Sequence, residues 1–104
     1  TIFATGSLAK GGAISCVVPM VSHVDHTEHD VDVIVTEYGA ADLRWKTPRE
    51  RAKLIIENCA HPDYRPQLRE YFAEACATSG GQTPHVLSKA LSWHQRYVET
   101  GSMK

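Results

Sequence analysis

A carboxylate follows the most strand-like segment of the sequence. Residues 31–36, VDVIVT, carry valine at every second position, and Glu37 then precedes a turn at Gly39. In open α/β sheets, ligands usually bind at the carboxyl ends of strands, where a carboxylate can position a substrate, polarise water or accept a proton. Glu37 is therefore the first candidate site residue. The alternative is a structural glutamate that bonds to loop amides or to an arginine such as Arg44.

Lys10 is the second candidate. It precedes Gly11 and Gly12 in the segment AKGG, which places one cation beside backbone amides that a ligand can approach closely. The segment matches neither the dinucleotide-binding fingerprint nor the P-loop. Taken alone, it also fits a surface turn with a solvated lysine.

Three histidines, His23, His26 and His29, are spaced three apart with acidic residues between them. Imidazole and carboxylate groups are ligands for zinc and other transition metals. Residues 22–30 contain one apolar side chain, so a packed helix that would align the histidines is not expected, and no zinc signature matches. We expect a polar loop near the mouth of a site and no metal centre, with a small metal-binding module as the alternative.

The composition describes an ordinary globular chain. Of 104 residues, 42% are hydrophobic and 22% charged, and the net charge of -1 does not favour binding to nucleic acid or to a membrane surface. No apolar stretch is long enough to span a bilayer, and no signal peptide is visible. The scattered Cys16, Cys59 and Cys76 predict reduced thiols and a cytoplasmic location. Cys16 lies in an apolar strand candidate, which argues against a reactive thiolate.

The first 46 residues have strand and loop character, and the rest are helical. Thr47 and Glu50 form a capping box with Pro48 between them, which predicts a helix start. The expected strands are 2–5, 13–20 and 31–36, the expected loops are 6–12 and 21–30, and residues 100–104 are expected to fray. Three helices are expected, each with apolar side chains spaced so that they share one face. These stripes are Ala52, Ile55, Ile56 and Cys59 in the first helix, and Leu68, Tyr71, Phe72, Ala75 and Cys76 in the second. The third helix is expected to start at Thr83-Pro84, with Leu87, Ala90, Leu91 and His94 on one side.

These elements predict an α/β fold: the end of an open sheet of about three strands, followed by three helices. We expect one unit over 1–104, with the strand and loop part at 1–46 carrying the site and a helical part at 47–99. The chain begins at Thr1 inside a strand-like run, so a fragment of a longer protein is expected. Such a fragment would expose a sheet edge and apolar surface, be marginally stable alone and tend to associate.

Four segments carry a family resemblance: LAKGGAIS, VVPMVSHVDHTEHDVDVIVTEYGAADLR, TPRERAKLIIENCAHPDYRPQLREYF and ALSWHQRYVETGSM. Together they closely resemble the C-terminal end of the acetyl-CoA hydrolase/transferase family, in particular its succinyl-CoA:acetate type CoA-transferases. The resemblance runs over nearly all of the chain and implies an end of a NagB/RpiA/CoA-transferase-like sheet.

The resemblance also implies a reaction. A glutamate attacks the acyl-CoA thioester, and a mixed anhydride and then a glutamyl-CoA thioester form. The family's substrates are acyl-CoA and a small carboxylate such as acetate or succinate, and no metal or organic cofactor stays bound. A homodimer and a missing N-terminal part that carries the nucleophile are implied. An acetyl-CoA hydrolase of the same family and an inactive truncated remnant are the alternatives.

Two site residues carry over from the family motifs. Lys10 matches the lysine that contacts CoA, and Glu37 matches the glutamate of the VTE-x-G motif, which lines the active site and is not itself acylated. The chain departs from the family pattern at Cys16 and Tyr38. It also departs at Trp45, and at this position the family has glycine. A glycine there indicates a turn with positive φ, which a bulky ring fits poorly.

Overall fold

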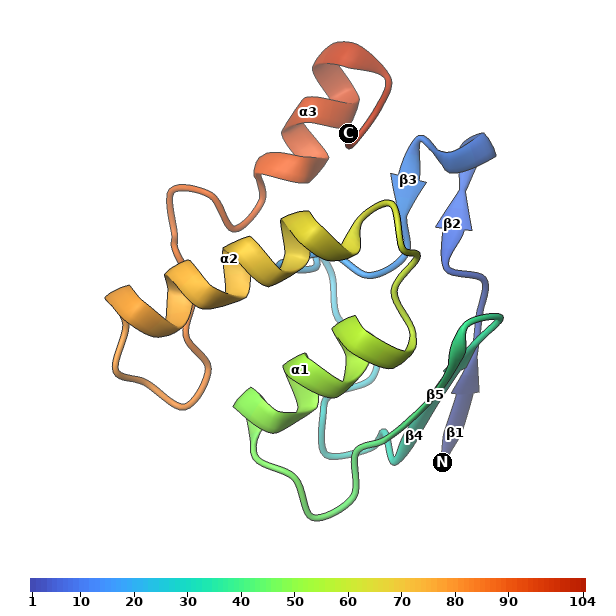
Figure 1. Ribbon diagram of the computed structural model, residues 1–104, viewed down its shortest axis with the longest axis vertical. Coiled ribbons are helices and arrows are strands. Elements are labelled where there is room, and N and C mark those ends of the chain that lie inside the picture. Colours follow the sequence, from blue (N-terminus) through green and yellow to red (C-terminus); the bar gives the residue numbers. More distant parts are fainter.

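Two small sheets and three helices form the chain in the computed structural model, which describes residues 1–104 (Figure 1). The strands are β1 (Ile2–Ala4), β2 (Leu8–Ala9), β3 (Ile14–Ser15), β4 (Val33–Thr36) and β5 (Gly39–Asp42), with a 3₁₀ turn η1 (Lys10–Gly12) between β2 and β3. The helices are α1 (Pro48–Asn58), α2 (Arg65–Thr78) and α3 (Ser92–Thr100). The α/β class and the order of strands before helices are as expected.

The larger sheet carries the candidate carboxylate. Its order is β1–β4–β5, with β1 parallel and β5 antiparallel to β4. Thr36 pairs with Gly39, so Glu37 and the residue after it are the whole connection between β4 and β5. Gly39 has a φ of +152°, and a Cβ atom there would lie 2.9 Å from the carbonyl oxygen of Asn58. Glycine is therefore required where this hairpin closes against the end of α1.

Strand β5 is missing from the sequence-based expectations. Its residues, Gly-Ala-Ala-Asp, have low strand propensity. The strand forms because its backbone pairs with β4 and because Ala41 and Leu43 are buried against α1, together with Cys59. Tertiary packing therefore decides the conformation of this segment.

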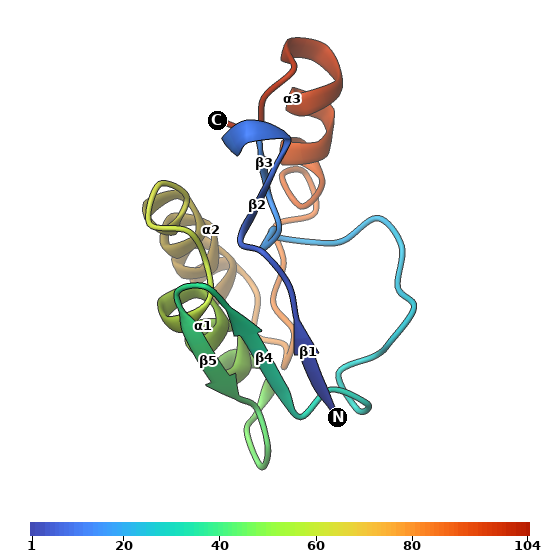
Figure 2. The same ribbon diagram turned by 90° about the vertical axis from the view of Figure 1, so that its right-hand side faces the viewer.

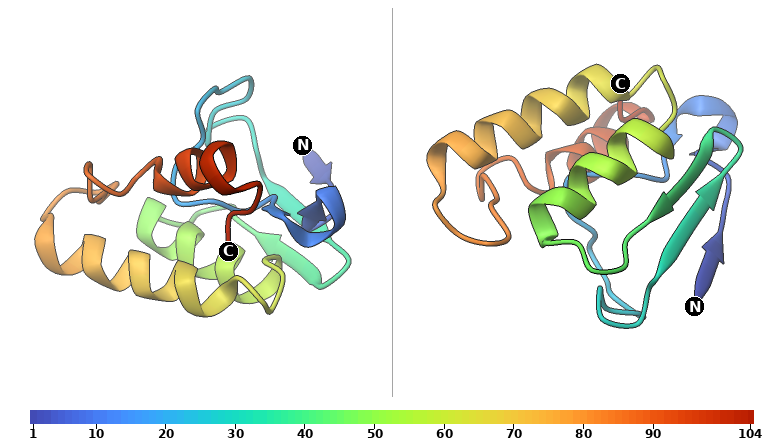
Figure 3. Two further views of the ribbon diagram at one scale, coloured as in Figure 1. Left: turned by 90° about the horizontal axis from the view of Figure 1, so that it is seen from above. Right: turned by 60° about the horizontal axis from the view of Figure 1, so that its bottom comes forward.

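The expectations for the segment before residue 20 are partly wrong. The loop expected over 6–12 contains β2, and the strand expected over 13–20 ends at Ser15. The two short strands pair antiparallel, and Lys10, Gly11 and Gly12 all have positive φ in the turn between them. Residues 16–32 contain no strand or helix. Val17 and Val18 pack against the main core, and the expected loop over 21–30 then bulges out on the side away from α2 (Figures 2 and 3).

The capping box at the start of α1 is confirmed. The Thr47 hydroxyl accepts a hydrogen bond from the Glu50 amide at 3.3 Å, and the Glu50 carboxylate accepts one from the Thr47 amide at 3.0 Å. Helices α1 and α2 lie side by side on one side of the larger sheet (Figure 2). From the predicted stripe of α1, Ile56 and Cys59 are buried.

The main core lies between α2, α3 and the β2–β3 hairpin. Its buried members are Ile56, Ala60, Tyr64, Leu68, Trp93 and Met103. Tyr64 is fully buried and its hydroxyl donates to the carbonyl oxygen of Gly12 at 2.8 Å. This bond ties the segment before α2 to the hairpin that carries Lys10.

The third helix begins later than expected. Helix α3 starts at Ser92, and Leu87 from the predicted stripe is 85% exposed. The amide of Val86 donates to the Tyr71 hydroxyl at 3.1 Å, so this segment bonds to α2 and not to a helical neighbour. The expectation of a helix from Thr83-Pro84 is therefore wrong.

The C-terminus is not frayed. Met103 is buried, and its amide donates to the carbonyl oxygen of Ala13 at 2.7 Å. Arg96 of α3 donates to the Met103 carbonyl oxygen. These bonds fix the C-terminal residues against the β2–β3 hairpin, where Figure 1 also places the chain end near β3. The expectation of fraying over 100–104 is wrong for this reason.

Several large apolar side chains are exposed: Ile2, Val21, Val24, Tyr38, Trp45, Leu87, Leu91 and Val98. Ile2 lies on β1, which is an edge strand of the larger sheet. None of the helices has the length and apolar character needed to cross a membrane.

Trp45 provides a test of backbone strain. It has a φ of +61°, in the left-handed region. Its side chain is 98% exposed, so no packing contacts offset the strain of this conformation. We expect Trp45→Gly to raise the free energy of unfolding by about 0.5–1 kcal/mol, because relief of strain exceeds the entropy that glycine adds to the unfolded chain. Urea unfolding measures this change. Lys46→Gly, at the neighbouring exposed position without positive φ, should instead be destabilising, and a gain there would contradict the explanation.

Candidate active site

Glu37 occupies the first position of the two-residue turn between β4 and β5. One of its carboxylate oxygens accepts a hydrogen bond from the Ser7 amide at 2.7 Å. Arg44 does not reach Glu37, because it forms an ion pair with Asp42 at 2.8 Å and lowers the pKa of Asp42 to about 2. Glu37 thus lies at the carboxyl end of β4, bonded to a loop amide and without an ion-pair partner.

Two opposing effects set the charge of Glu37. Burial raises the pKa of Glu37, but the hydrogen bonds from Ser7 and the nearby charge of His61 lower it, and the net pKa is below the usual value. The carboxylate is therefore ionised at neutral pH. It can accept a proton or a hydrogen bond from a substrate group at this edge of the sheet.

Ser7 approaches Glu37 because β1 and β4 are parallel. The segment after β1 reaches the same edge of the sheet as Glu37, and the Thr5 amide still donates to the carbonyl oxygen of Val35 at 3.0 Å. Ser7 is fully buried, and its hydroxyl has no hydrogen-bond partner. A buried hydroxyl without a partner costs about 1–3 kcal/mol, so this group is an exception to the usual pairing of buried polar atoms.

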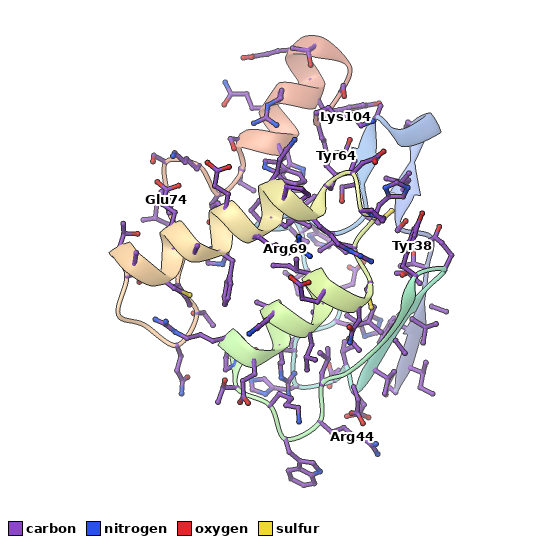
Figure 4. The ribbon with its side chains drawn as sticks, in the orientation of Figure 1. Tyr38, Arg44, Tyr64, Arg69, Glu74 and Lys104 are labelled. Carbon is purple, nitrogen blue, oxygen red and sulfur yellow. The ribbon has the colours of Figure 1, made fainter.

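An aromatic and cationic group lies on the other side of the turn. The Tyr38 ring packs edge-on against His61, with the ring centroids 5.1 Å apart. The Arg65 guanidinium lies 5.6 Å from the centre of the same ring. Figure 4 shows Tyr38 at the end of the β4–β5 hairpin that faces the start of α2. These groups give the turn a face suited to an anionic or carbonyl-bearing ligand.

Sequence reasoning missed Ser7 and Arg65. The signal for Ser7 was available, because carboxyl ends of adjacent parallel strands converge, and Ser7 closely follows β1 as Glu37 follows β4. Arg65 had no local signal: it reaches Tyr38 only because α1 turns into α2 beside the hairpin.

Lys10 lies in η1, at the tip of the β2–β3 hairpin. Its side chain is exposed and forms no ion pair, and its φ is +52°. Ser7, at the base of the same hairpin, contacts Glu37. Three residues of extended chain span on the order of 10 Å, so Lys10 lies within about that distance of Ser7, the residue that bonds to Glu37.

Cys16 directly follows β3. It is exposed, and its amide donates to the carbonyl oxygen of Ser7 at 2.9 Å. Partial shielding of the sulfur from water and the negative charge of Glu37 raise the pKa of the Cys16 thiol. Its expected place inside a strand is wrong, and the raised pKa agrees with the expected absence of a reactive thiolate.

The three histidines of the 21–30 segment do not converge. His23 bonds to Asp25 at 3.0 Å, and the ring of His26 packs against Phe3 with centroids 4.9 Å apart. No group of three or more His, Cys, Asp or Glu side chains is arranged to hold a metal ion. The prediction of an exposed polar loop is confirmed.

Comparison with known proteins identifies the family. The family model of the acetyl-CoA hydrolase/transferase C-terminal domain matches residues 1–72. The chain belongs to this family. This result confirms the resemblance seen in the VTEYG and ADLR motifs, and it places Glu37 and Lys10 inside the matched region of the acetyl-CoA hydrolase/transferase domain.

Individual relatives of this family extend the match beyond residue 72. A succinyl-CoA:acetate CoA-transferase of Clostridium kluyveri is 69% identical over all 104 residues, which are 19% of its length. An acetyl-CoA hydrolase of Candida glabrata is 56% identical over 95 residues, or 88% of this chain and 18% of that protein. The chain therefore spans about a fifth of the length of the curated relatives it matches.

A solved structure supports the fold. The crystal structure of a 4-hydroxybutyrate CoA-transferase from Porphyromonas gingivalis superposes with a TM-score of 0.62 at 42% identity. The superposition covers 70% of this chain and 18% of that one. The α/β arrangement described above is therefore that of a CoA-transferase segment.

The effect of the Glu37 charge on Cys16 can be tested by alkylation. We expect Glu37→Gln to speed iodoacetamide labelling of Cys16 at pH 7.5, because loss of the negative charge lowers the pKa of the thiol and increases the thiolate fraction. Mass spectrometry of timed samples measures the rate at each cysteine.

Cys59 is the internal control for this labelling. It is buried and should stay slow in both proteins. Equal labelling of Cys16 with and without the Glu37 charge would show that this charge does not act on the thiol.

Proposed function

We propose that this chain forms part of an acyl-CoA:carboxylate CoA-transferase and supplies Glu37 as the carboxylate that supports a nucleophilic glutamate located outside the chain. The observation that carries the proposal is the ionised Glu37, held at the carboxyl end of β4 by the Ser7 amide, in a chain that belongs to this enzyme family. The 69% identity to a succinyl-CoA:acetate CoA-transferase supports the acetyl- and succinyl-CoA class of substrate.

The proposed reaction moves CoA between two carboxylates. The nucleophilic glutamate attacks the thioester carbonyl, and the CoA thiolate leaves to give a mixed anhydride. The thiolate then attacks the glutamyl carbonyl of the anhydride and releases the first carboxylate, which leaves a glutamyl-CoA thioester. The second carboxylate takes the place of the first, and the same steps in reverse form the new acyl-CoA and restore the glutamate.

Glu37 has a supporting role in this scheme. As an ionised group held by a backbone amide, it orients the attacking group or the substrate carboxyl group and is not acylated itself. The Arg65 guanidinium beside Tyr38 offsets negative charge when a carboxylate enters. The site thus provides one fixed acceptor and a region of positive charge.

Lys10 binds the phosphates of coenzyme A in this proposal. Its exposed ammonium group lies beside Gly11 and Gly12, which let a ligand approach the backbone closely. Coenzyme A enters and leaves as part of the substrate, so no permanently bound cofactor and no metal ion are required.

Acetyl-CoA hydrolase activity is the second candidate. The 56% identity to an acetyl-CoA hydrolase favours it, and the two activities differ in whether water or a carboxylate consumes the glutamyl-CoA thioester. An inactive remnant is the remaining alternative.

We further propose a cytoplasmic location, supported by three free cysteines, and a homodimer, supported by the exposed apolar side chains.

A chimeric enzyme tests the role of Glu37. The chain replaces the matching segment of the Clostridium kluyveri relative, and CoA transfer from succinyl-CoA to acetate is measured. We expect the chimera to be active and Glu37→Gln to lower kcat by roughly 10²–10³-fold, the range of a positioned acid–base group. Normal kcat in Glu37→Gln would contradict the proposed role, and an inactive parent chimera would favour the remnant. Release of free CoA without acetate would favour the hydrolase.

The same chimera tests Lys10. We expect Lys10→Ala to raise KM for succinyl-CoA about five- to tenfold with little change in kcat, because one exposed charge contact is worth on the order of 1 kcal/mol. Alanine keeps the Cβ atom and therefore the positive-φ strain of this position. Lys46→Ala is the control, since that lysine is also exposed but lies beyond β5. An unchanged KM in Lys10→Ala would remove this residue from the CoA site.

A further inference from the structure

We propose that Ser7 is a positioning residue that holds Glu37 with two donors, its backbone amide at all times and its buried hydroxyl when the carboxylate turns toward the substrate. The inference rests on the proposed function, in which Glu37 supports the reacting glutamate. It adds a residue that no sequence motif pointed to.

The amide contact is built into the fold. The Ser7 amide donates to Glu37 at 2.7 Å, and the Ser7 carbonyl oxygen accepts from the Cys16 amide at 2.9 Å. Ser7 is therefore held on both sides, by the turn after β4 and by the end of β3. Its backbone cannot shift without breaking the β2–β3 hairpin, so the position of Glu37 is fixed by paired strands.

The hydroxyl is the second observation. Ser7 is fully buried, and its hydroxyl oxygen is the one buried side-chain polar atom without a hydrogen-bond partner. The Ser7 side chain also helps to lower the pKa of the Glu37 carboxyl, so it lies near that group, although its hydroxyl has no hydrogen-bond partner. A carboxylate that turns toward this hydroxyl would give it the partner it lacks, so the unpaired buried donor fits a carboxylate that moves during the reaction.

Other ionisable groups also face Glu37 and contribute to its charge. Cys16 lies beside it at the end of β3, and His61 approaches from the segment between α1 and α2. Arg65 lies over the ring of Tyr38 on the same side. Among these groups, Ser7 alone donates a hydrogen bond to the carboxylate, so its removal should have an effect distinct from a change in surrounding charge.

The test is the titration of the Glu37 carboxyl carbon by NMR in the 104-residue chain. Ser7→Ala removes the hydroxyl and keeps the amide. We expect the pKa of Glu37 to rise in this variant. In the chimeric enzyme, the acid limb of the kcat–pH profile should move to higher pH, with kcat about tenfold lower at the acid end and KM for succinyl-CoA unchanged.

Ser15→Ala is the matched control. Ser15 is also buried and pairs with Leu8 in the same hairpin, but its hydroxyl donates to the Val17 carbonyl oxygen. The control should leave the Glu37 titration unchanged even if it lowers stability. Equal titrations in both variants would overturn the proposal. If Ser7→Ala does not fold, Ser7→Gly provides the same comparison, because it also keeps the amide.

The two readouts separate the inference from the proposed function. The NMR titration depends only on the contact between Ser7 and Glu37, and the parent chimera tests CoA transfer. A raised pKa in an inactive chimera would support the contact and reject the function. An unchanged pKa in an active chimera would reject the contact alone.

Discussion

The close approach of the end of α1 to the β4–β5 hairpin determines the rest of the site. The Thr36 hydroxyl donates to the carbonyl oxygen of Cys59 at 2.7 Å, and Gly39 leaves room for Asn58. Thr36 and Cys59 are both buried, so loss of this hydrogen bond would leave buried polar groups without a partner, which lowers the stability of the fold. The bond and the steric fit fix the hairpin turn, which in turn fixes the direction of Glu37.

The hairpin and the segment after β1 act together. Parallel pairing of β1 with β4 brings Ser7 to Glu37, and the fold of the β2–β3 hairpin continues from Ser7 to Lys10. Tyr64 secures the far end of that hairpin through Gly12. A chain with few fully buried residues can therefore still hold its polar groups in place, because hydrogen bonds to backbone groups fix the positions of both hairpins.

Local signals explain what the sequence could predict. The capping box at Thr47, the alternation over 31–36 and the polarity of 21–30 each depend on neighbouring residues. The structure agrees with the first and the third, and of the strand expected over 31–36 it forms Val33–Thr36. Strand β5 and the late start of α3 depend on contacts with distant elements, which propensity does not report. The site shows the same difference between local and distant signals. Sequence motifs predicted Glu37 and Lys10, but the contact of Ser7 with Glu37 follows only from the parallel pairing of β1 with β4.

The two-residue connection between β4 and β5 also limits how the chain can change in length. An added or deleted residue there would shift the register by one and turn every following side chain to the opposite face of the sheet. The exposed 21–30 loop has no such restriction, because lengthening a flexible loop adds little closure entropy. Insertions and deletions among relatives should therefore gather in the histidine-rich loop and avoid the turn that carries Glu37.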